Sequence, residues 1–301
     1  GKEIAFMGKT YTVEEATFDS FKGIDIALFA GGSISKDFAP HAVKAGAVVI
    51  DNSSAFRMDP DVPLVVPEVN PQAILKHKGI IANPNCSTII MVMALKPIYD
   101  LAKIKRVIVS TYQAVSGAGK EGIDELDAQV RDHSEGREMT ANILPSASAE
   151  KHYPIAFNLI PQIDVFCDNL YTKEEMKMVN ETKKIMEDYE MRITATTIRV
   201  PVYRSHSESV NIELEKEVDL GAMREALAKF PGVTVQDDPS KQEYPMPLYT
   251  SEKDDVYVGR LRRDESCEKS YNMWVVGDQI RKGAALNTLQ IAETMIKNGW
   301  I

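Results

Sequence analysis

The chain has 301 residues, of which 44% are hydrophobic and 26% charged, as is typical of globular rather than disordered proteins. At about 150 residues per domain, this length predicts two domains. The net charge of −9 without a Lys/Arg block argues against nucleic-acid binding, and the longest apolar run, residues 89–95, is too short to cross a membrane. Three cysteines without a CxxC pair argue against a disulfide framework or a cysteine zinc site. With no signal peptide visible, we expect a reduced, cytoplasmic protein.

The first 85 residues alternate between short apolar runs and helix-length segments. The runs, each typical of a buried strand, are residues 24–30, 47–50, 64–66 and 79–82, and residues 35–45 read as a helix ended by Gly46. This alternation predicts a Rossmann-like, doubly wound parallel sheet, in which loops at the carboxyl ends of the strands bind ligands.

The remaining segments predict a second domain of α+β type with a largely antiparallel sheet. A helix over 86–101, with Asn85 as its N-cap, precedes the other elements. We expect strands at 107–112, 193–202, 207–215 and 271–276, and helices at 122–130, 171–189, 219–230 and 282–298. The predicted domains are 1–84 and 85–281, with the C-terminal helix in 282–301 returning to the first domain.

The sharpest local motif is Asn-Pro-Asn-Cys-Ser-Thr at residues 83–88, which follows a strand pattern and opens a helix. The positive end of the helix dipole and nearby backbone N–H groups favour a thiolate at Cys86, and the thiolate is the nucleophilic form. The alternative is a small buried cysteine that caps a core helix. Cys167 and Cys267 lack this setting and are read as structural.

A thiol nucleophile needs an acid/base partner, and His206 is the best placed candidate. It follows an apolar strand that is broken at Pro201, so its ring can face a cleft. The other histidines lie in helical or charged stretches and are read as exposed: His41, His77, His133 and His152.

Several residues suit an anionic ligand. Arg57 follows a parallel strand and can hold a phosphate or carboxylate through two parallel hydrogen bonds. Glu174 and Lys177 are three residues apart on one helix face, and this spacing taken alone favours a surface salt bridge over a ligand site. The Gly-rich segment 116–119 lets backbone N–H groups approach a phosphate or a nicotinamide amide.

Together these motifs resemble aspartate-semialdehyde dehydrogenases, and most closely the Gram-positive bacterial branch of that family. The matching segments are spread from about residue 24 to residue 296: 83–88, 110–119, 153–158, 174–177, 199–206 and 273–276. The combination is specific, although no single segment is.

The resemblance implies NADPH-dependent reductive dephosphorylation of 4-phospho-L-aspartate to aspartate 4-semialdehyde, the branch step toward lysine, methionine and threonine. It implies a homodimer or homotetramer whose second domain supplies the interface. It also implies a thioester intermediate on Cys86.

Roles for individual residues follow from the same resemblance. Cys86 would attack the acyl phosphate, His206 would be the acid/base group, and Gln113 would orient the acyl group. The substrate would be bound by Arg57, Asn85 and Lys177 at its phosphate, Glu174 at its ammonium and Arg199 at its carboxylate, and the cofactor by Ser116, Gly117 and Gln279.

One feature departs from the family pattern. Family members begin with a strand and a Gly-Ala-Thr-Gly-type loop that cradles the NADP pyrophosphate, whereas this sequence begins at Gly-Lys-Glu-Ile-Ala-Phe. We therefore expect that about one βαβ unit of roughly 30 residues lies outside the chain, and that the chain as written binds NADPH poorly. The choice of NADP over NAD rests on the resemblance alone.

Three other functions remain open at this point. The nearest is another phosphorylating reductase, such as N-acetyl-glutamyl-phosphate reductase or glyceraldehyde-3-phosphate dehydrogenase, which also places a cysteine at a helix start. A cysteine hydrolase would use Cys86 and His206 without a nucleotide. A non-catalytic assembly partner is the third.

Overall fold

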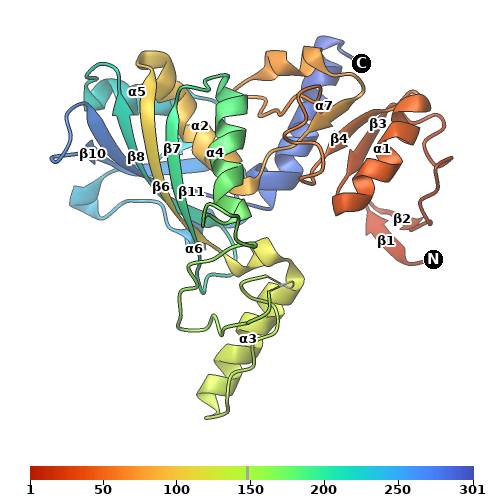
Figure 1. Cartoon of the computed structure of the whole chain (residues 1–301), viewed down its shortest axis with the longest axis horizontal. Coiled ribbons are helices and arrows are strands. Elements are labelled where there is room, and N and C mark those ends of the chain that lie inside the picture. The colour runs from red at the N-terminus through yellow and green to blue at the C-terminus, as the bar shows by residue number, and fades with distance from the viewer. Residues whose placement is uncertain (147–148) are drawn as a thin grey trace.

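The computed structural model describes residues 1–146 and 149–301 of the chain. Figure 1 shows a large sheet with helices on one side, a smaller N-terminal unit beside it, and an arm that projects from the large sheet. The functional candidates lie where these parts meet.

The N-terminal unit is built on three short parallel strands in the order β3-β4-β5. Their bounds are β3 Ile26–Phe29, β4 Val48–Asp51 and β5 Ile80–Ala82, and α1 Ser35–Lys44 follows β3. Three of the predicted strands and the predicted helix are therefore confirmed. The prediction of a strand at 64–66 is wrong, because Leu64 forms only an isolated bridge to Ala82.

The first residues form a separate hairpin. Strands β1 Glu3–Phe6 and β2 Lys9–Thr12 pair antiparallel to each other, and every residue of both strands is exposed. The hairpin forms a sheet of its own and adds no strand to the parallel sheet. Sequence patterning did not predict it, since an exposed pair of strands buries no alternating apolar face.

Helix α2, Cys86–Leu101, is the central helix of the molecule, and its predicted bounds are confirmed. Residues 87–95 are all buried. This burial is expected, because a helix that is apolar on every side has no face suited to water. Asn85 caps the helix as predicted: its Oδ1 accepts hydrogen bonds from the N–H groups of Ser87 at 3.1 Å and Thr88 at 3.2 Å. The cap fixes the position of the first helical residue, Cys86.

The large sheet has the strand order β7-β6-β8-β11-β10-β9. Its longest strands are β6 Ile104–Gln113, β7 Arg192–Arg199, β8 His206–Leu214, β10 Val256–Arg263 and β11 Ser270–Gly277, and β9 is Val233–Val235. The pairs β6–β8, β8–β11 and β10–β11 are antiparallel, whereas β6–β7 and β9–β10 are parallel. The predicted sheet is confirmed as mainly antiparallel, and the sequence missed β9 and β10.

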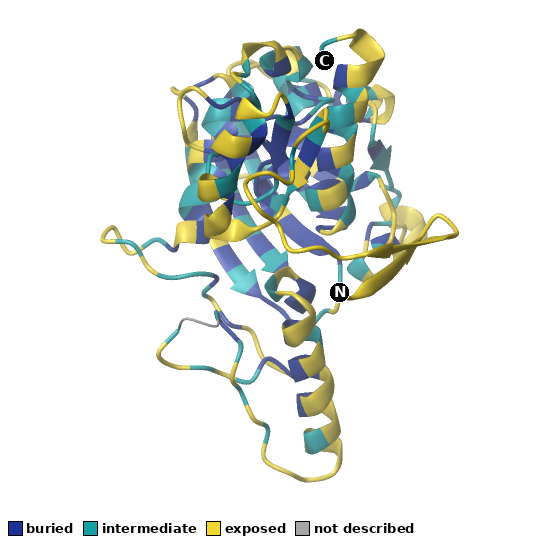
Figure 2. Ribbon diagram, turned by 90° about the vertical axis from the view of Figure 1, so that its right-hand side faces the viewer, coloured by how far each residue is buried: buried dark blue, intermediate teal, exposed yellow. Residues whose placement is uncertain are grey.

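One face of this sheet is covered by helices α2, α4 Lys173–Met186 and α5 Leu220–Lys229 (Figure 1). Their apolar faces and the sheet share one buried core, seen as the dark blue interior in Figure 2. The carboxyl ends of β6 and β7 lie next to the start of β8, because β8 runs antiparallel to β6. Gln113, Arg199 and His206 therefore come together at this end of the strands.

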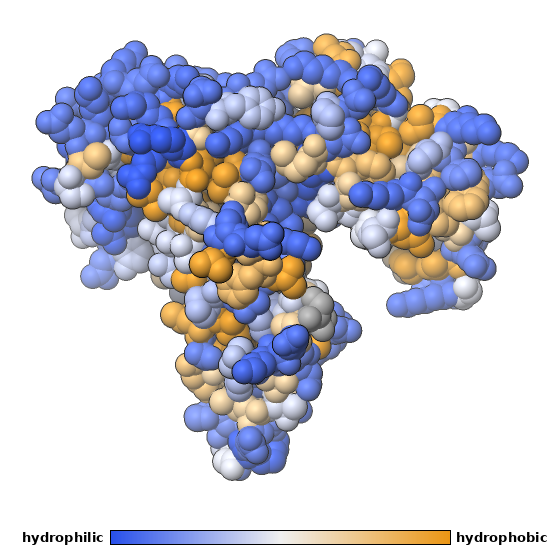
Figure 3. Space-filling model, in the orientation of Figure 1, coloured by the Kyte–Doolittle hydropathy of each residue, from blue (hydrophilic) through white to orange (hydrophobic). Residues whose placement is uncertain are grey.

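The arm contains α3 Lys120–Ser134 and the chain that returns to α4. It has a small apolar cluster of its own that includes Leu126, Leu144 and Ile155. Figure 3 shows apolar side chains gathered where the arm leaves the sheet domain.

The chain ends by returning to the N-terminal unit. A π-helical turn, Arg281–Ala285, leads into α7 Leu286–Asn298, whose Ile291 and Met295 pack on Ile50 and Ile81. The turn also contacts the start of α2, because a Cβ atom on Gly283 would lie 3.0 Å from the Cβ atom of Cys86. Within residues 1–146 and 149–301, no helix combines the length and apolar character needed to span a bilayer.

Candidate active site

The Cys86 thiol lies at the start of α2, where α2, α4 and the π-helical turn converge. Burial raises the pKa of this thiol to about 12, and the negative charge of Glu174 adds to the rise. The positive charges of Arg57 and Arg199 act in the opposite direction. The sequence predicted that the helix start would favour a thiolate, but burial outweighs that effect in the structure, and the neutral thiol is favoured at pH 7.

His206 is fully buried at the start of β8. Its Nδ1 accepts a hydrogen bond from the Ala114 N–H at 3.1 Å, so the proton of a neutral ring is on Nε2. Nε2 has no hydrogen-bond partner in the part of the chain that the structure describes. Burial, followed by the charge of Arg199, holds the pKa of His206 well below its ordinary value, which keeps the ring neutral.

Arg199 ends β7 beside this histidine, and its Nη1 donates to the Ala114 carbonyl at 2.7 Å. The side chains of Arg199 and His206 both lie close to Gly117. A Cβ atom on Gly117 would lie 2.7 Å from Arg199 Nη1 and 3.3 Å from His206 Nε2. A larger residue would therefore displace both groups, and the Gly-rich segment predicted at 116–119 needs glycine at this position for close approach.

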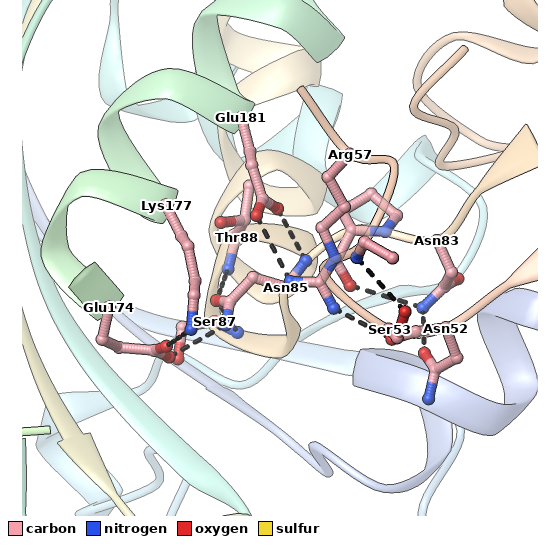
Figure 4. A network of polar contacts seen from close by, with 12 residues as sticks. Asn52, Ser53, Arg57, Asn83, Asn85, Ser87, Thr88, Glu174, Lys177 and Glu181 are labelled. Atoms are coloured by element: carbon pink, nitrogen blue, oxygen red, sulfur yellow. Dashed lines mark hydrogen bonds and ion pairs between the residues drawn. The ribbon is translucent and has the colours of Figure 1, made fainter. Parts of the chain in front are cut away.

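Glu174 is the central anion of the site. Its Oε1 accepts a hydrogen bond from Asn85 Nδ2 at 2.9 Å, and its Oε2 lies 3.2 Å from Lys177 Nζ (Figure 4). Oε1 also accepts from Gln113 Nε2 at 3.3 Å. Burial alone would raise the pKa of Glu174, but Lys177 and the two amide donors lower it below its ordinary value. The carboxylate is thus ionised, and the Glu174–Lys177 pair is part of a buried network rather than an isolated surface salt bridge.

Arg57 reaches the same network from the loop that follows β4. Its Nη1 lies 3.3 Å from Glu181 Oε1, and its Nη2 donates to the Asn52 carbonyl at 3.0 Å (Figure 4). Its Nε is buried and has no partner among the described residues. The guanidinium therefore keeps donors for an anion.

The predicted cofactor residues also meet. Gln279 Nε2 donates to Ser116 Oγ, and Gln279 Oε1 accepts from the Ser205 N–H at 2.9 Å. Ser116 precedes Gly117, so this pair lies next to the space bordered by Arg199 and His206. All the residues predicted for the site are thus brought to the junction of the N-terminal unit, α2, α4 and the large sheet.

Known proteins resemble the chain along nearly its whole length. A family model described as semialdehyde dehydrogenase, NAD binding domain, matches residues 1–77, and one described as semialdehyde dehydrogenase, dimerisation domain, matches residues 95–282. The aspartate-semialdehyde dehydrogenase of Aquifex aeolicus is 57% identical over 100% of this chain and 88% of its own length. That of Bacillus subtilis is 53% identical over 99% of this chain and 86% of its own.

The chain belongs to the aspartate-semialdehyde dehydrogenase family. A solved structure agrees: aspartate semialdehyde dehydrogenase II complexed with ASA from Vibrio cholerae has a TM-score of 0.91 and 46% identity, covering 99% of this chain and 87% of that one. The predicted resemblance and fold class are confirmed. The other phosphorylating reductases and the cysteine hydrolase are not favoured.

Sequence analysis missed two charged members of the network, Asp164 and Glu181. Asp164 Oδ2 accepts from Lys177 Nζ at 2.9 Å. The Glu181 side chain is 1% exposed and contacts both Arg57 and the backbone N–H of Asn85. Its spacing of seven residues from Glu174, two helical turns, was a signal that could have placed it on the same face of α4. Two buried amides were also missed: Asn83 donates to Asn52 Oδ1 at 2.6 Å and accepts from Asn287 at 2.7 Å.

Proposed function

We propose that the chain reduces 4-phospho-L-aspartate to L-aspartate 4-semialdehyde with NADPH, and that Cys86 is the nucleophile. The observation that carries this proposal is the grouping of one thiol with two arginines and one carboxylate at a helix start. The charges of Glu174, Arg57 and Arg199 all act on the pKa of Cys86, so these three groups lie within electrostatic reach of the sulfur.

The substrate has a matching set of charges. Its phosphate would bind the free donors of Arg57 together with Lys177 and Asn85, and its α-carboxylate would bind Arg199. Its ammonium group would bind Glu174, which is ionised in the structure. An acyl phosphate bound in this way has its carbonyl carbon near Cys86, with Gln113 available to orient the carbonyl.

The charges of the substrate act on the thiol in both directions. An ammonium group paired with Glu174 would offset the negative charge that helps to raise the pKa of Cys86. The phosphate and the α-carboxylate would at the same time offset the charges of Arg57 and Arg199, which lower that pKa. Substrate binding alone therefore gives the thiol no net electrostatic activation, and we expect its proton to leave as the sulfur attacks.

The chemistry then takes place on the sulfur of Cys86. The sulfur attacks the acyl carbon and a C–S bond forms, while the C–O bond to phosphate breaks and phosphate leaves with the bonding electrons and takes up the thiol proton. NADPH, when bound, supplies the hydride that reduces the thioester. His206 Nε2–H donates to the substrate oxygen as negative charge develops on it, and breaking the C–S bond frees the aldehyde and returns the thiolate.

The residues present fit the nicotinamide end of a dinucleotide at this junction. The parallel strands β3 and β4 end at one edge, where the loop after β3 contains Gly32 with a φ of +66°. Ser116, Gly117 and Gln279 would contact the nicotinamide end, and the absence of a side chain on Gly117 gives the ring space to approach Arg199 and His206.

Two further features belong to the proposal. We place the protein in the cytoplasm, where its three unpaired cysteines would stay reduced. We expect a homodimer or homotetramer, because the family model over residues 95–282 describes a dimerisation domain.

The test replaces the nucleophile. Cys86→Ala should lower phosphate-dependent turnover of aspartate semialdehyde by at least about a thousandfold and abolish acylation of the protein, as seen by mass spectrometry. Cys167→Ala is the matched control, because Cys167 is also a partly buried free thiol. Turnover that survives in the Cys86 variant would remove this residue as nucleophile, and turnover of N-acetylglutamate semialdehyde instead would change the substrate.

A further inference from the structure

Helix α4 presents a stripe of alternating charge to the site. Glu174, Lys177, Glu181 and Lys184 are spaced by three, four and three residues, so their side chains lie on one helical face. The functional proposal gives roles to Glu174 and Lys177 only. The other two side chains reach toward the loop after β4 and the start of α2, as the contacts of Glu181 in Figure 4 show.

This face of α4 holds Asn85 at two points. Glu174 Oε1 accepts from the Asn85 side-chain amide at 2.9 Å, and Glu181 Oε2 accepts from the Asn85 backbone N–H at 2.7 Å. Asn85 is the N-cap of α2 and directly precedes Cys86. The two carboxylates therefore fix the position of the sulfur relative to α4.

The same face also holds Arg57 at two points. Lys184 Nζ donates to the Arg57 carbonyl at 2.8 Å and to the carbonyls of Asp59 at 2.7 Å and Val62 at 2.8 Å. Glu181 Oε1 lies 3.3 Å from Arg57 Nη1. Lys184 thus positions the backbone of this loop, and Glu181 positions the guanidinium.

Glu181 is the residue that both attachments share. We propose that Glu181 is a positioning residue for the phosphate step: its two carboxylate oxygens bind the Arg57 guanidinium and the Asn85 N–H, and so set the distance between the phosphate-binding group and the Cys86 sulfur. A second connection between the two segments is indirect: Asn52 accepts from Arg57 Nη2 at 3.0 Å and from Asn83 Nδ2 at 2.6 Å. Glu181, by contrast, contacts Arg57 and Asn85 with one carboxylate.

The environment of Glu181 favours a functional role over a stabilising one. The side chain is fully buried, and burial raises the pKa of its carboxyl group despite the charge of Arg57 and the hydrogen bond from Asn85. A raised pKa means that the ionised carboxylate costs folding free energy at neutral pH. The buried Arg57 Nε keeps a free donor, so Glu181 orients the guanidinium without using up its capacity for an anion.

The proposal rests on the proposed function, because it assumes that Arg57 binds phosphate. The experiment measures how phosphate protects Cys86 from alkylation by iodoacetamide, with the alkylated residue identified by mass spectrometry. This readout needs neither the nucleotide nor the aldehyde. The phosphate concentration that halves the alkylation rate reports the affinity of the site next to the sulfur.

Two variants test the bridge. Glu181→Gln keeps the shape of the side chain but loses its charge, and Glu181→Asp keeps the charge but is too short to reach both partners. Each should raise the half-protecting phosphate concentration about tenfold to a hundredfold, because a misplacement of about 1 Å has effects of this size. In steady-state assays the KM for phosphate should rise more than the KM for aspartate semialdehyde.

Glu175→Gln is the matched control. Glu175 is a buried glutamate on the same helix and accepts two backbone N–H bonds, from Thr172 at 2.7 Å and Thr197 at 3.0 Å, but it has no ion-pair partner among the described residues. It should lower the thermal midpoint at least as much as Glu181→Gln while leaving the half-protecting phosphate concentration unchanged. A role of Glu181 in folding alone would instead shift the midpoint and leave protection as it is.

The outcomes separate the two proposals. If phosphate protects the wild type and both Glu181 variants equally, the positioning role is wrong and the proposed function stands. If Glu181→Asp behaves as the wild type, charge alone suffices and the bridge is wrong. If phosphate fails to protect even the wild type, the phosphate site of the proposed function is wrong, and the role of Glu181 fails with it.

Discussion

The N-terminal unit and the large sheet differ in the length and the burial of their strands. Strands β3, β4 and β5 have three or four residues each, whereas β6, β7, β8 and β11 have eight to ten. Hairpin β1–β2 is wholly exposed, while the large sheet shares one continuous core with α2, α4 and α5. The large sheet is therefore the rigid platform of the molecule, and the small unit contributes loops to it.

The candidate site follows this division. Gln113, Arg199 and His206 come from strand ends of the large sheet and are 3% exposed or less. Arg57, by contrast, comes from a loop of the small unit and needs Lys184 and Glu181 of α4 to hold it. The comparison teaches that groups on the platform are placed by packing, whereas the group that comes from the loop is placed by added polar contacts.

The largest expected effect tests the platform itself. Ile90 is fully buried on α2, with side-chain carbons 3.0–3.4 Å from where a Cβ atom on Gly277 would lie. Ile90→Ala should lower the free energy of unfolding by about 2–5 kcal/mol, because it leaves a cavity in a packed core. Urea unfolding measures the change. The control is Ile296→Ala on α7, where the side chain is 62% exposed. Equal losses of unfolding free energy at both positions would contradict the view that the core of the large sheet dominates stability.

Arg57→Leu tests the loop contribution. It should raise the phosphate requirement of aldehyde oxidation about a hundredfold, equivalent to about 2.7 kcal/mol, with a smaller change in the aldehyde requirement. Initial rates at varied phosphate and varied aldehyde separate the two. Arg192→Leu is the control, since Arg192 is exposed at the opposite end of β7 from Arg199. An unchanged phosphate dependence would remove Arg57 from the phosphate site.

A smaller effect concerns a buried carboxyl group of the platform. Glu208 lies on β8, and neither of its oxygens has a partner within the described residues. Burial raises the pKa of Glu208 well above its ordinary value of 4.5, so the folded protein keeps a proton that the unfolded chain releases. Stability contributed by this group is thus present below pH 4.5 and is lost as the pH rises, by about 1.4 kcal/mol per unit.

Glu208→Gln should remove this slope. Thermal unfolding at pH 5.5, 6.5 and 7.5 should show a midpoint that depends less on pH in the variant than in the wild type. Glu213→Gln is the control on the same strand, because Lys105 and Arg192 hold the pKa of Glu213 below its ordinary value. Parallel pH profiles for the wild type and Glu208→Gln would mean that the carboxyl group is ionised in the fold.

The sequence was most informative where burial is complete. The bounds of α2 and its cap were predictable because an apolar helix that follows Asn85 leaves little alternative. Strand β10 escaped prediction because its half towards Arg263 is charged and partly exposed, which hides the period-2 pattern. The hairpin β1–β2 escaped because nothing in it is buried.

The site followed the same rule. Motifs placed Cys86, Arg199 and His206 at element ends, where fold rules bring them together. Sequence alone did not give the pKa of Cys86, because that value depends on burial and on charges from three other segments. Glu181 was missed because its partners, Arg57 and Asn85, are 124 and 96 residues away in the chain.

The smallest expected effect lies in the hairpin, where the same substitution as in α2 should be almost silent. Ile4 is 49% exposed and pairs across the hairpin with Tyr11. Ile4→Ala removes the same carbon atoms as Ile90→Ala, but these atoms stay in contact with water, so no cavity forms and the free energy of unfolding should change by less than about 0.5 kcal/mol. Urea unfolding of the two variants side by side measures the contrast between the regions. A loss at Ile4 above about 1 kcal/mol would show that the hairpin packs on a surface in solution, and the contrast between platform and hairpin would then be wrong.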